Sequence, residues 1–534
     1  MRARWGLAVA SAMILTGCSQ QTSSVRGDVL VGDGDPTGGA FVGQQLGPTV
    51  SSSIQPVPGA GISTAPEHEP RGTDAWRIIR PAAGRIAAYT TRTSAPPGAR
   101  VGLKVSTRAK RYRVSAYRIG VYPGGSGALI WRSRFLAGRE QSAAVLSPVE
   151  TRTVVAPWRR SLTFDTTGWE PGFYVLELRT GLGWETAVPY VVSSLSAEGT
   201  IALVAPVTTW QAYNAWGGYS LYAGPAGDRR SWAVSYDRPY NLMTGANDYR
   251  TAAIPVILRA ERLHHRRGVP LSYFTNVDLD QHPGALDGAH GYVSMGHDEY
   301  WTPAMRKAVE AARGGGTNLA FLGANTMYWR IRLEDRTTGP ARLQVGYRSD
   351  AALDPLRATR PTEATSRFRD QPAPEPEQAV TGMMYECYPV DAAYVVASPT
   401  WWGFRGTSVR AGDRFDGLVG PEADRVYLNT RTPRPMEVLS HSSYSCRGTT
   451  TSTESVYYTT KSGSGVFSAG TLRWGCAIVD RCEYPLGART RAFVRRVTDN
   501  VLEGFAAGPA GRQHPARDTV TRYRLPDVNS VDAS

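Results

Sequence analysis

The stretch GYVSMGHDEYWTPAMRKAVEAA, from Gly291 to Ala312, decides how the rest of the chain is interpreted. Its first residues are small, β-branched or aromatic, as in a buried strand, and Gly296 allows a sharp turn before a helix begins. Thr302 suits the N-cap of that helix, and Pro303 suits its first turn. The sequence therefore predicts a strand, a turn and a helix in immediate succession.

Four titratable side chains occupy the predicted turn: His297, Asp298, Glu299 and Tyr300. In an open α/β sheet, ligands bind at the carboxyl ends of the strands, so this crowding indicates a site. The alternative is a solvated loop whose acids complement the positive N-terminus of the following helix. Such a loop has no need of a histidine and two aromatic rings, which favours the site.

The length of 534 residues predicts two or three domains, and 41% hydrophobic with 20% charged residues is a globular composition. The formal net charge is +14, but the arginines are spread along the whole chain. Because no block of basic residues forms a groove-sized patch, we expect no nucleic-acid partner.

The N-terminus resembles a bacterial lipoprotein signal peptide. Arg2 and Arg4 precede the apolar run LAVASAMIL, which ends in Leu15-Thr16-Gly17-Cys18 and is too short to span a bilayer. The resemblance implies that Cys18 is lipidated and anchors an exported protein to the outer face of the bacterial cell membrane. No other stretch is apolar enough to cross a membrane, so the lipid is the only membrane contact expected. A plain secretory signal is the alternative.

Four further cysteines are present: Cys387, Cys446, Cys476 and Cys482. An even number in an exported chain favours two disulfides, for which three pairings exist. Closure is easiest between Cys476 and Cys482, which would leave Cys387 with Cys446. None of them sits at a strand-to-helix turn beside a base, so we assign them no catalytic role.

The pattern along the chain predicts five segments. After the signal peptide and lipobox at 1–18, residues 19–71 are rich in Gly, Ser, Thr, Pro and Gln, which is typical of a flexible linker. Residues 72–196 carry short alternating runs such as YRVSAYRIG and GFYVLELRT, which predict an antiparallel, immunoglobulin-like β-sandwich. Residues 197–508 alternate between strand and helix, and 509–534 form a peripheral tail.

The alternation in 197–508 predicts an α/β fold with a parallel sheet and helices on both faces. Within it, IALVAPVTTW and PLSYFTNVDLD are expected as strands. At about 330–465 the alternation is lost, and we expect a β and loop insertion that covers the sheet edge or the cleft.

Common hydrolase motifs are missing from the sequence. There is no G-x-S-x-G elbow and no H-E-x-x-H, and the pair His264 and His265 lies on a basic helix where a solvated surface is expected. The remaining candidates are oxygen donors with one histidine, which suit a hard cation such as ferric iron.

Several uncommon motifs follow one another between about Thr200 and Ala506: AYNAWGGYSLY, VSYDRPY, TNVDLD, VSMGHDEYW, and NLAFLGAN with MYWRIR. In this order they resemble the large-subunit catalytic domain of the N,N-dimethylformamidase family. The insertion segments GPARLQVGYRS and TSRFRDQ are also similar to segments of the family. The resemblance implies a glutamine-amidotransferase-like α/β fold.

The resemblance further implies one iron, bound by two tyrosines and a glutamate as its ligands. The glutamate falls on Glu299 of GHDEYW, and the first tyrosine on Tyr213 of AYN. For the second tyrosine, VSYDRPY offers Tyr240 and Tyr236. Tyr240 is preferred, because family members more often have Phe at the position of Tyr236.

The function implied is hydrolysis of a C–N amide bond at a mononuclear ferric iron. The metal would polarise a carbonyl or lower the pKa of bound water, and His297 or Asp298 would move the protons. The expected partner is a small or amide-bearing substrate. Dimethylformamidase works with a small second subunit, so a separate small subunit or a homo-oligomer is also open.

The competing function is a non-catalytic cell-surface protein that binds glycans or envelope partners on the same scaffold. Its binding surface would be the sandwich and an aromatic-rich rim formed by Trp210, Trp216, Trp301, Trp329, Trp401 and Trp402.

Overall fold

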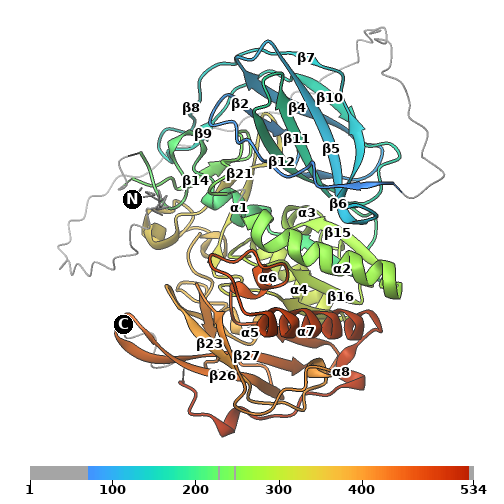
Figure 1. The fold of residues 1–534 in the computed structure, drawn as a ribbon. Coiled ribbons are helices and arrows are strands. Elements are labelled where there is room, and N and C mark those ends of the chain that lie inside the picture. The colour runs from blue at the N-terminus through green and yellow to red at the C-terminus, as the bar shows by residue number, and fades with distance from the viewer. Residues whose placement is uncertain (1–69, 226–228, 246–247, 528–534) are drawn as a thin grey trace, which may run out of the picture. The chain divides into compact units, whose positions relative to one another are not determined.

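The structure, a computed structural model, describes residues 70–225, 229–245 and 248–527. These residues form one compact unit with a β-rich N-terminal part and a part that mixes helices and strands (Figure 1). Cys18 and nearly all of the predicted linker lie outside the described residues. Within the described ranges, no helix is both long and apolar enough to cross a membrane.

Two sheets, antiparallel except for the short parallel pairing of β12 with β3, share one buried core in the N-terminal part, as in a sandwich. The larger has the strand order β1-β6-β5-β11-β12-β3 with β7 beside β5, and the smaller has the order β10-β4-β2. Leu103 of β4 and Leu176 of β11 are both fully enclosed in this core. The strands are β1 (Gly72–Thr73), β2 (Ile86–Thr90), β3 (Ser94–Ala95), β4 (Arg100–Thr107), β5 (Arg111–Tyr122), β6 (Gly125–Arg132), β7 (Leu136–Ala137), β10 (Leu162–Asp165), β11 (Gly172–Thr180) and β12 (Glu185–Val192), with a separate ribbon of β8 (Val145–Leu146) and β9 (Val154–Val155).

A seven-stranded sheet with the order β15-β13-β16-β18-β28-β27-β26 is the centre of the rest of the molecule. Its first five strands pair in parallel, but β27 pairs antiparallel with both β28 and β26, so the sheet is mixed rather than wholly parallel as predicted. The strands are β13 (Ile201–Ala205), β15 (Leu271–Thr275), β16 (Gly291–Ser294), β18 (Asn318–Phe321), β26 (Met436–Cys446), β27 (Thr449–Thr459) and β28 (Gly465–Ser468).

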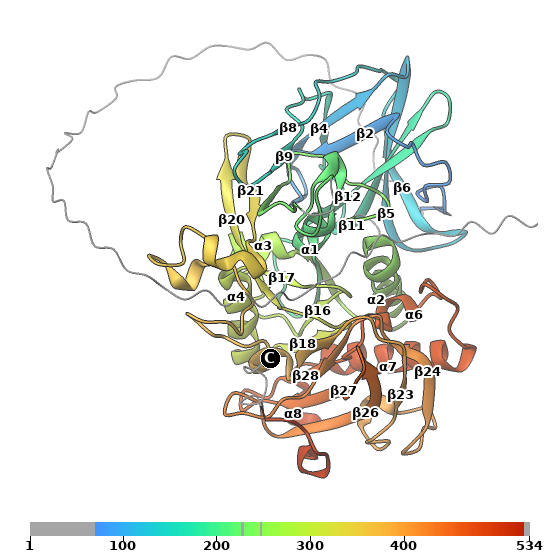
Figure 2. The same ribbon diagram turned by 90° about the vertical axis from the view of Figure 1, so that its left-hand side faces the viewer.

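Helices cover both faces of this sheet because successive strand residues point in opposite directions. Val293 of β16 packs in the core formed with α2 and α7, whereas Tyr292 packs in the core formed with α3 and α4. Figure 2 shows β16 and β18 between α4 on one side and α2 and α7 on the other. The helices are α1 (Val207–Tyr213), α2 (Ile254–Arg267), α3 (Asn276–Gln281), α4 (Pro303–Gly314), α5 (Gln378–Thr381), α6 (Arg473–Ala477), α7 (Ala488–Ala506) and α8 (Ala510–Gln513).

Two predicted strands are shorter than expected. β13 ends at Ala205 and α1 begins at Val207, and β15 ends at Thr275, which caps α3 by accepting a hydrogen bond from the Asp278 amide. Thr275 thus starts a helix instead of extending its strand, whereas α1 begins directly after Pro206 without a side-chain cap. This shortening brings Tyr213 onto a helix.

The predicted insertion at 330–465 does not only cover the sheet, because it also supplies β26 and β27 to it. The tail is not wholly peripheral either, since Ala510 and Val520 are buried. Smaller ribbons complete the molecule: β14 (Ala233–Ser235) with β21 (Gly339–Val345) and β20 (Arg332–Arg336), β17 (Tyr300–Trp301) with β19 (Trp329–Arg330), β22 (Met384–Cys387) with β25 (Ala423–Arg425), and β23 (Ala392–Val395) with β24 (Arg414–Val419).

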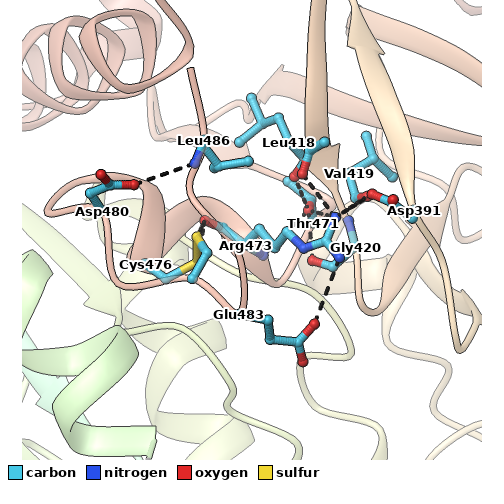
Figure 3. The surroundings of a disulfide bond; sticks show 12 residues. Asp391, Leu418, Val419, Gly420, Thr471, Arg473, Cys476, Asp480, Glu483 and Leu486 are labelled. Carbon is cyan, nitrogen blue, oxygen red and sulfur yellow. Dashed lines mark hydrogen bonds and ion pairs between the residues drawn. A yellow bond between two sulfur atoms is a disulfide. The ribbon is translucent and has the colours of Figure 1, made fainter. Parts of the chain in front are cut away.

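Two disulfides join the pairs that closure along the chain favours. Cys387 at the end of β22 is bonded to Cys446 at the end of β26, and Cys476 in α6 is bonded to Cys482. Figure 3 shows the second bond beside Arg473, whose guanidinium donates to the carbonyls of Gly417 and Val419.

The turn after β16 depends on Gly296. Its φ is 83°, a conformation that side chains rarely adopt, and a Cβ there would lie 2.4 Å from the Cβ of Ala252. The helix α4 follows as predicted, with Thr302 as N-cap accepting from the Met305 amide and Pro303 in the first turn.

We expect Gly296→Ala to lower the free energy of unfolding by about 3 kcal/mol, because it adds both backbone strain and a steric clash. Gly314→Ala is the matched control, because a Cβ at Gly314 meets nothing within 4 Å and the residue ends α4. That control should leave stability unchanged or raise it by up to about 1 kcal/mol. Urea unfolding of both variants measures this, and equal stabilities would contradict the role of Gly296.

Candidate active site

The turn between β16 and β17 presents Glu299 to the interior. Thr209 of α1 fixes the backbone there, since its hydroxyl oxygen accepts hydrogen bonds from the amides of Glu299 and Tyr300 at 2.9 and 3.3 Å. Thr208 donates to the carbonyl of Tyr300 at 2.7 Å. The helix that follows strand β13 therefore holds the turn that follows its neighbour β16.

The Glu299 carboxylate is the centre of the site. Its Oε2 atom accepts hydrogen bonds from the hydroxyl groups of Tyr213, at 2.9 Å, and Tyr222, at 2.7 Å. The two phenol rings are stacked with centroids 4.1 Å apart, and Tyr300 donates to the Tyr222 oxygen at 2.8 Å. One buried carboxylate thus joins two tyrosines from separate segments.

His297 lies on the other side of the same carboxylate oxygen. Its Nε2 atom is 3.4 Å from Glu299 Oε2 and 3.4 Å from Glu422 Oε2, and its Nδ1 atom is 3.7 Å from Asp248 Oδ2. The imidazole is buried, and neither Nε2 nor Glu422 Oε2 has a hydrogen-bond partner. Buried polar atoms without partners in a native site call for a ligand or a chemical role.

Glu422 reaches the site from the turn before β25. Leu472 donates its amide to the Glu422 carbonyl at 3.2 Å, and Arg473 donates its amide to Gly420 at 2.8 Å. Thr471 accepts from the Gly420 amide at 3.0 Å and donates to Leu418 at 2.8 Å, as Figure 3 shows in part. The start of α6 thereby holds the segment that ends in Glu422.

Burial and neighbouring charges shift the pKa values of His297, Glu422 and Glu299. Burial alone would lower the pKa of His297, but the charge of Glu422 and the nearby carboxylates of Asp248 and Glu299 raise it well above its ordinary value. Burial raises the pKa of Glu422 to about 7 against the opposing charge of His297. Burial also acts on Glu299, but His297 holds its pKa below the ordinary value. Perturbed groups of this kind cluster at functional sites.

The guanidinium of Arg348 lies against the face of the Tyr222 ring. Its guanidinium carbon lies 3.9 Å from the centre of the Tyr222 ring, and the residue has a φ of 61° although it is not glycine. Burial and the charge of Glu299 raise the pKa of Tyr222 well above its ordinary value, while Arg348 opposes that rise. A cation on the ring face keeps the phenol in place and moderates the cost of its ionisation.

The structure brings together Tyr213, His297 and Glu299 as the sequence suggested, but Tyr240 is not with them. Tyr240 lines a small cavity, about 20 Å³ in volume, together with Tyr236 and Arg238. The second phenol beside Glu299 is Tyr222, which lies nine positions after Tyr213 in AYNAWGGYSLY. The sequence predicted the second tyrosine in the next motif. It does not reveal that the turn at Gly217 and Gly218 folds Tyr222 back toward Glu299.

Asp298 points away from this group. Its carboxylate accepts from the hydroxyl of Ser294 at 2.8 Å and from that of Tyr292 at 3.4 Å, both on β16. Burial raises the pKa of Asp298 to about 7. This geometry suits support of the turn better than proton transfer.

Glu422, which the sequence analysis did not single out, occupies the place beside His297 instead. In the sequence, Glu422 is one of three acids in the stretch DGLVGPEAD, and nothing local distinguishes it from Asp416 and Asp424.

The oxygen atoms around Glu299 fit a hard cation. The hydroxyl oxygens of Tyr213 and Tyr222 lie 2.9 and 2.7 Å from Glu299 Oε2, which is close enough for neighbouring ligands with metal–oxygen bonds of about 2 Å. Among the residues described, no group of three or more His, Cys, Asp and Glu side chains could hold a metal ion. A cation here would therefore depend on the phenols, and an all-oxygen set suits a hard cation.

The tryptophans predicted to form an exposed rim are mostly core residues. Trp210, Trp301, Trp329 and Trp401 are buried. Trp402 packs against the core from a partly buried position, and Trp216 packs edge-to-face on Trp158. Large aromatic surfaces are enclosed wherever strands and helices can cover them. The rim is therefore wrong as a glycan-binding surface.

Fold and site together define a mixed α/β protein with a carboxylate-centred buried site, preceded by a β-sandwich. The chain matches the model of the family described as N,N-dimethylformamidase beta subunit-like, C-terminal, over residues 113–484, which is more than half of its length. The chain belongs to this family. The match begins within β5 and ends before α7, so it includes more of the sandwich, and less of the C-terminal part, than the motifs predicted.

No curated protein matches the chain. Among solved structures, a cycloisomaltooligosaccharide glucanotransferase from Paenibacillus sp., complexed with cycloisomaltoheptaose, is similar at 6% identity with a TM-score of 0.16. The similarity covers 67% of this chain and 59% of that one, so the chain spans less than two thirds of the relative's length. A likeness this low carries no argument about fold or function.

The raised pKa of Asp298 predicts a pH effect on stability. The folded protein keeps this proton up to about pH 7, whereas the ordinary value is 3.8, so the stabilisation is complete below pH 3.8 and is lost as the pH rises through 7. Because the amide in Asp298→Asn cannot ionise, the free energy of unfolding of this variant should fall by up to about 4 kcal/mol less than that of the wild type between acid and neutral pH. Urea unfolding at acid and neutral pH measures it. Asp416→Asn, at a side chain that is 88% exposed, should keep the wild-type pH dependence.

Proposed function

We propose that this protein is a metal-dependent hydrolase of a C–N amide bond, with Tyr213, Tyr222 and Glu299 as ligands of a mononuclear ferric ion. The observation that carries the proposal is the convergence of two phenols and His297 on one carboxylate oxygen. Membership of the dimethylformamidase-like family supports a hydrolase-type activity and the use of a metal.

A ferric ion bound there would supply Lewis acidity, which polarises the amide carbonyl and favours ionisation of water. The chain's own residues provide the rest. Two phenolates and a carboxylate offset the charge of the cation, and Arg348 lies against the Tyr222 ring and assists loss of its proton. The buried setting excludes bulk water and strengthens every charge interaction within the site.

His297 and Glu422 are the proposed proton carriers. Glu422, with a pKa raised to about 7, takes a proton from the attacking water, because a base is most effective when its pKa is near the working pH. His297, whose raised pKa keeps it protonated, gives a proton to the departing amine nitrogen. The water oxygen bonds to the carbonyl carbon, the C–N bond breaks, and a carboxylic acid and an amine result.

Three further parts of the proposal concern the setting of the site. The α/β part is proposed to be glutamine-amidotransferase-like, supported by five parallel strands with helices on both faces. Lipidation of Cys18 is proposed to anchor the protein to the outer face of the cell membrane, supported by the lipobox pattern alone. Association with a second subunit is supported by the family's description as beta subunit-like.

Substitution of the ligands should remove the metal. We expect Tyr213→Phe, Tyr222→Phe and Glu299→Gln each to lower iron content per chain several-fold, and the wild-type protein to show a tyrosinate-to-iron absorption band that weakens in both Phe variants. Tyr240→Phe is the matched control, because Tyr240 lines a separate cavity. Its iron content and absorption band should be those of the wild type.

The result that sinks the metal assignment is an iron-free, colourless protein whose hydrolysis of an amide panel is unaffected by all three substitutions. Loss of iron in Tyr240→Phe but not in Tyr222→Phe would instead restore the ligand expected from the sequence.

Glu422→Gln should separate proton transfer from metal binding. It retains the shape of the side chain but cannot accept a proton, so amide hydrolysis should fall by about 10²- to 10⁴-fold while iron content is unchanged. The pH profile of kcat/KM should also lose its limb near pH 7. Glu386→Gln is a control of the same chemistry, because Glu386 bonds with Tyr427 and Arg425 instead. Full activity in Glu422→Gln would exclude Glu422 as the base.

A further inference from the structure

The sandwich exposes two large aliphatic side chains at adjoining positions. Ile79 is 80% exposed and Leu182, in the turn between β11 and β12, is 73% exposed. Their segments are joined by hydrogen bonds, because Arg80 donates its guanidinium to the Leu182 carbonyl at 2.8 Å and its amide to Glu185 at 3.1 Å. Side chains of this size are normally covered unless the surface serves a contact.

Arginines stacked on aromatic rings surround the two aliphatic side chains. The guanidinium groups of Arg80 and Arg85 each lie 4.0 Å from the centre of the Trp184 ring. The same arrangement recurs beside the turn, where Arg111 and Arg113 lie 4.6 and 4.1 Å from the centre of the Phe135 ring. The Arg111 carbonyl accepts from the Gly181 amide at 2.9 Å, which makes the two stacks continuous through the turn.

The charge of this surface is not balanced. The nearby acids Glu177 and Glu185 are both buried and pair with Arg179. Within the described part of the chain, no ion pair is recorded for Arg80, Arg85, Arg111 or Arg113. We call the eight residues the basic–apolar patch: Ile79, Arg80, Arg85, Arg111, Arg113, Phe135, Leu182 and Trp184.

We propose that the basic–apolar patch docks the sandwich on an anionic lipid bilayer. The aliphatic side chains of Ile79 and Leu182 enter the boundary between headgroups and acyl chains, where they leave water. The arginines pair with lipid phosphates, and their aromatic partners hold them extended toward the surface. A purely polar anionic polymer would satisfy the arginines but would leave the two aliphatic side chains in water, so charge and apolarity together favour a bilayer. This inference does not depend on the proposed amide hydrolysis.

Vesicle co-sedimentation tests the proposal with the full chain carrying Cys18→Ser throughout, so that no attached lipid contributes. This protein should bind vesicles that contain phosphatidylglycerol more tightly than vesicles of phosphatidylcholine alone, and added salt should weaken the difference. The double substitution Arg80→Gln with Arg85→Gln should lower the partition coefficient about 25-fold, since each basic residue contributes about fivefold. Ile79→Ser with Leu182→Ser should lower it about tenfold.

Two controls match these changes. Leu195→Ser removes an aliphatic side chain that is 86% exposed away from the stacks, and Arg108→Gln removes an exposed arginine that pairs with Glu140. Both should bind as the parent does. Equal binding to both kinds of vesicle, or equal losses in patch and control variants, would overturn the proposal. So would a dimer in sedimentation velocity that the Ile79→Ser and Leu182→Ser changes abolish, because the patch would then be an interface between copies.

Discussion

The burial of the Glu299 carboxylate is the interaction on which the site depends. A carboxylate removed from water is costly unless donors or opposite charge surround it. Here Tyr213 and Tyr222 donate hydrogen bonds, and the imidazole of His297 lies 3.4 Å away. Because these residues are far apart along the chain, the carboxylate can be satisfied only when the helix α1, the loop after it and the turn after β16 are all in place. Folding and site assembly are therefore the same event.

The scaffold around the carboxylate explains how such a site is held. α1 contributes both a phenol and the Thr209 hydroxyl that fixes the backbone of Glu299. From the opposite side, the start of α6 holds the segment that ends in Glu422. Two acids and a histidine meet in a buried place because each lies on a backbone segment fixed by hydrogen bonds.

Local chemistry was sufficient for several predictions. Gly296, Thr302 and Pro303 act within a few residues, so the strand, turn and helix follow from the sequence, and Cys476 with Cys482 pair because they are close along the chain. The ends of the strands in the apolar runs 201–210 and 270–280 were predicted wrongly, since an apolar run alone does not show at which residue a strand ends and a helix begins. Long-range pairing of β26 and β27 with β28 carries no local signal, because it depends on chain segments that only the sheet brings together.

The sequence by itself determined that Glu299 stands in a strand-to-helix turn and that tyrosines from earlier motifs are its candidate partners. Only the tertiary structure decided which tyrosine: Tyr222 is brought onto the carboxylate, whereas Tyr240 lines a separate cavity. It also placed Glu422 beside His297 and turned Asp298 toward β16. The physical reason is that residue type and spacing specify hydrogen-bonding capacity, while the direction in which a side chain points depends on packing between distant segments.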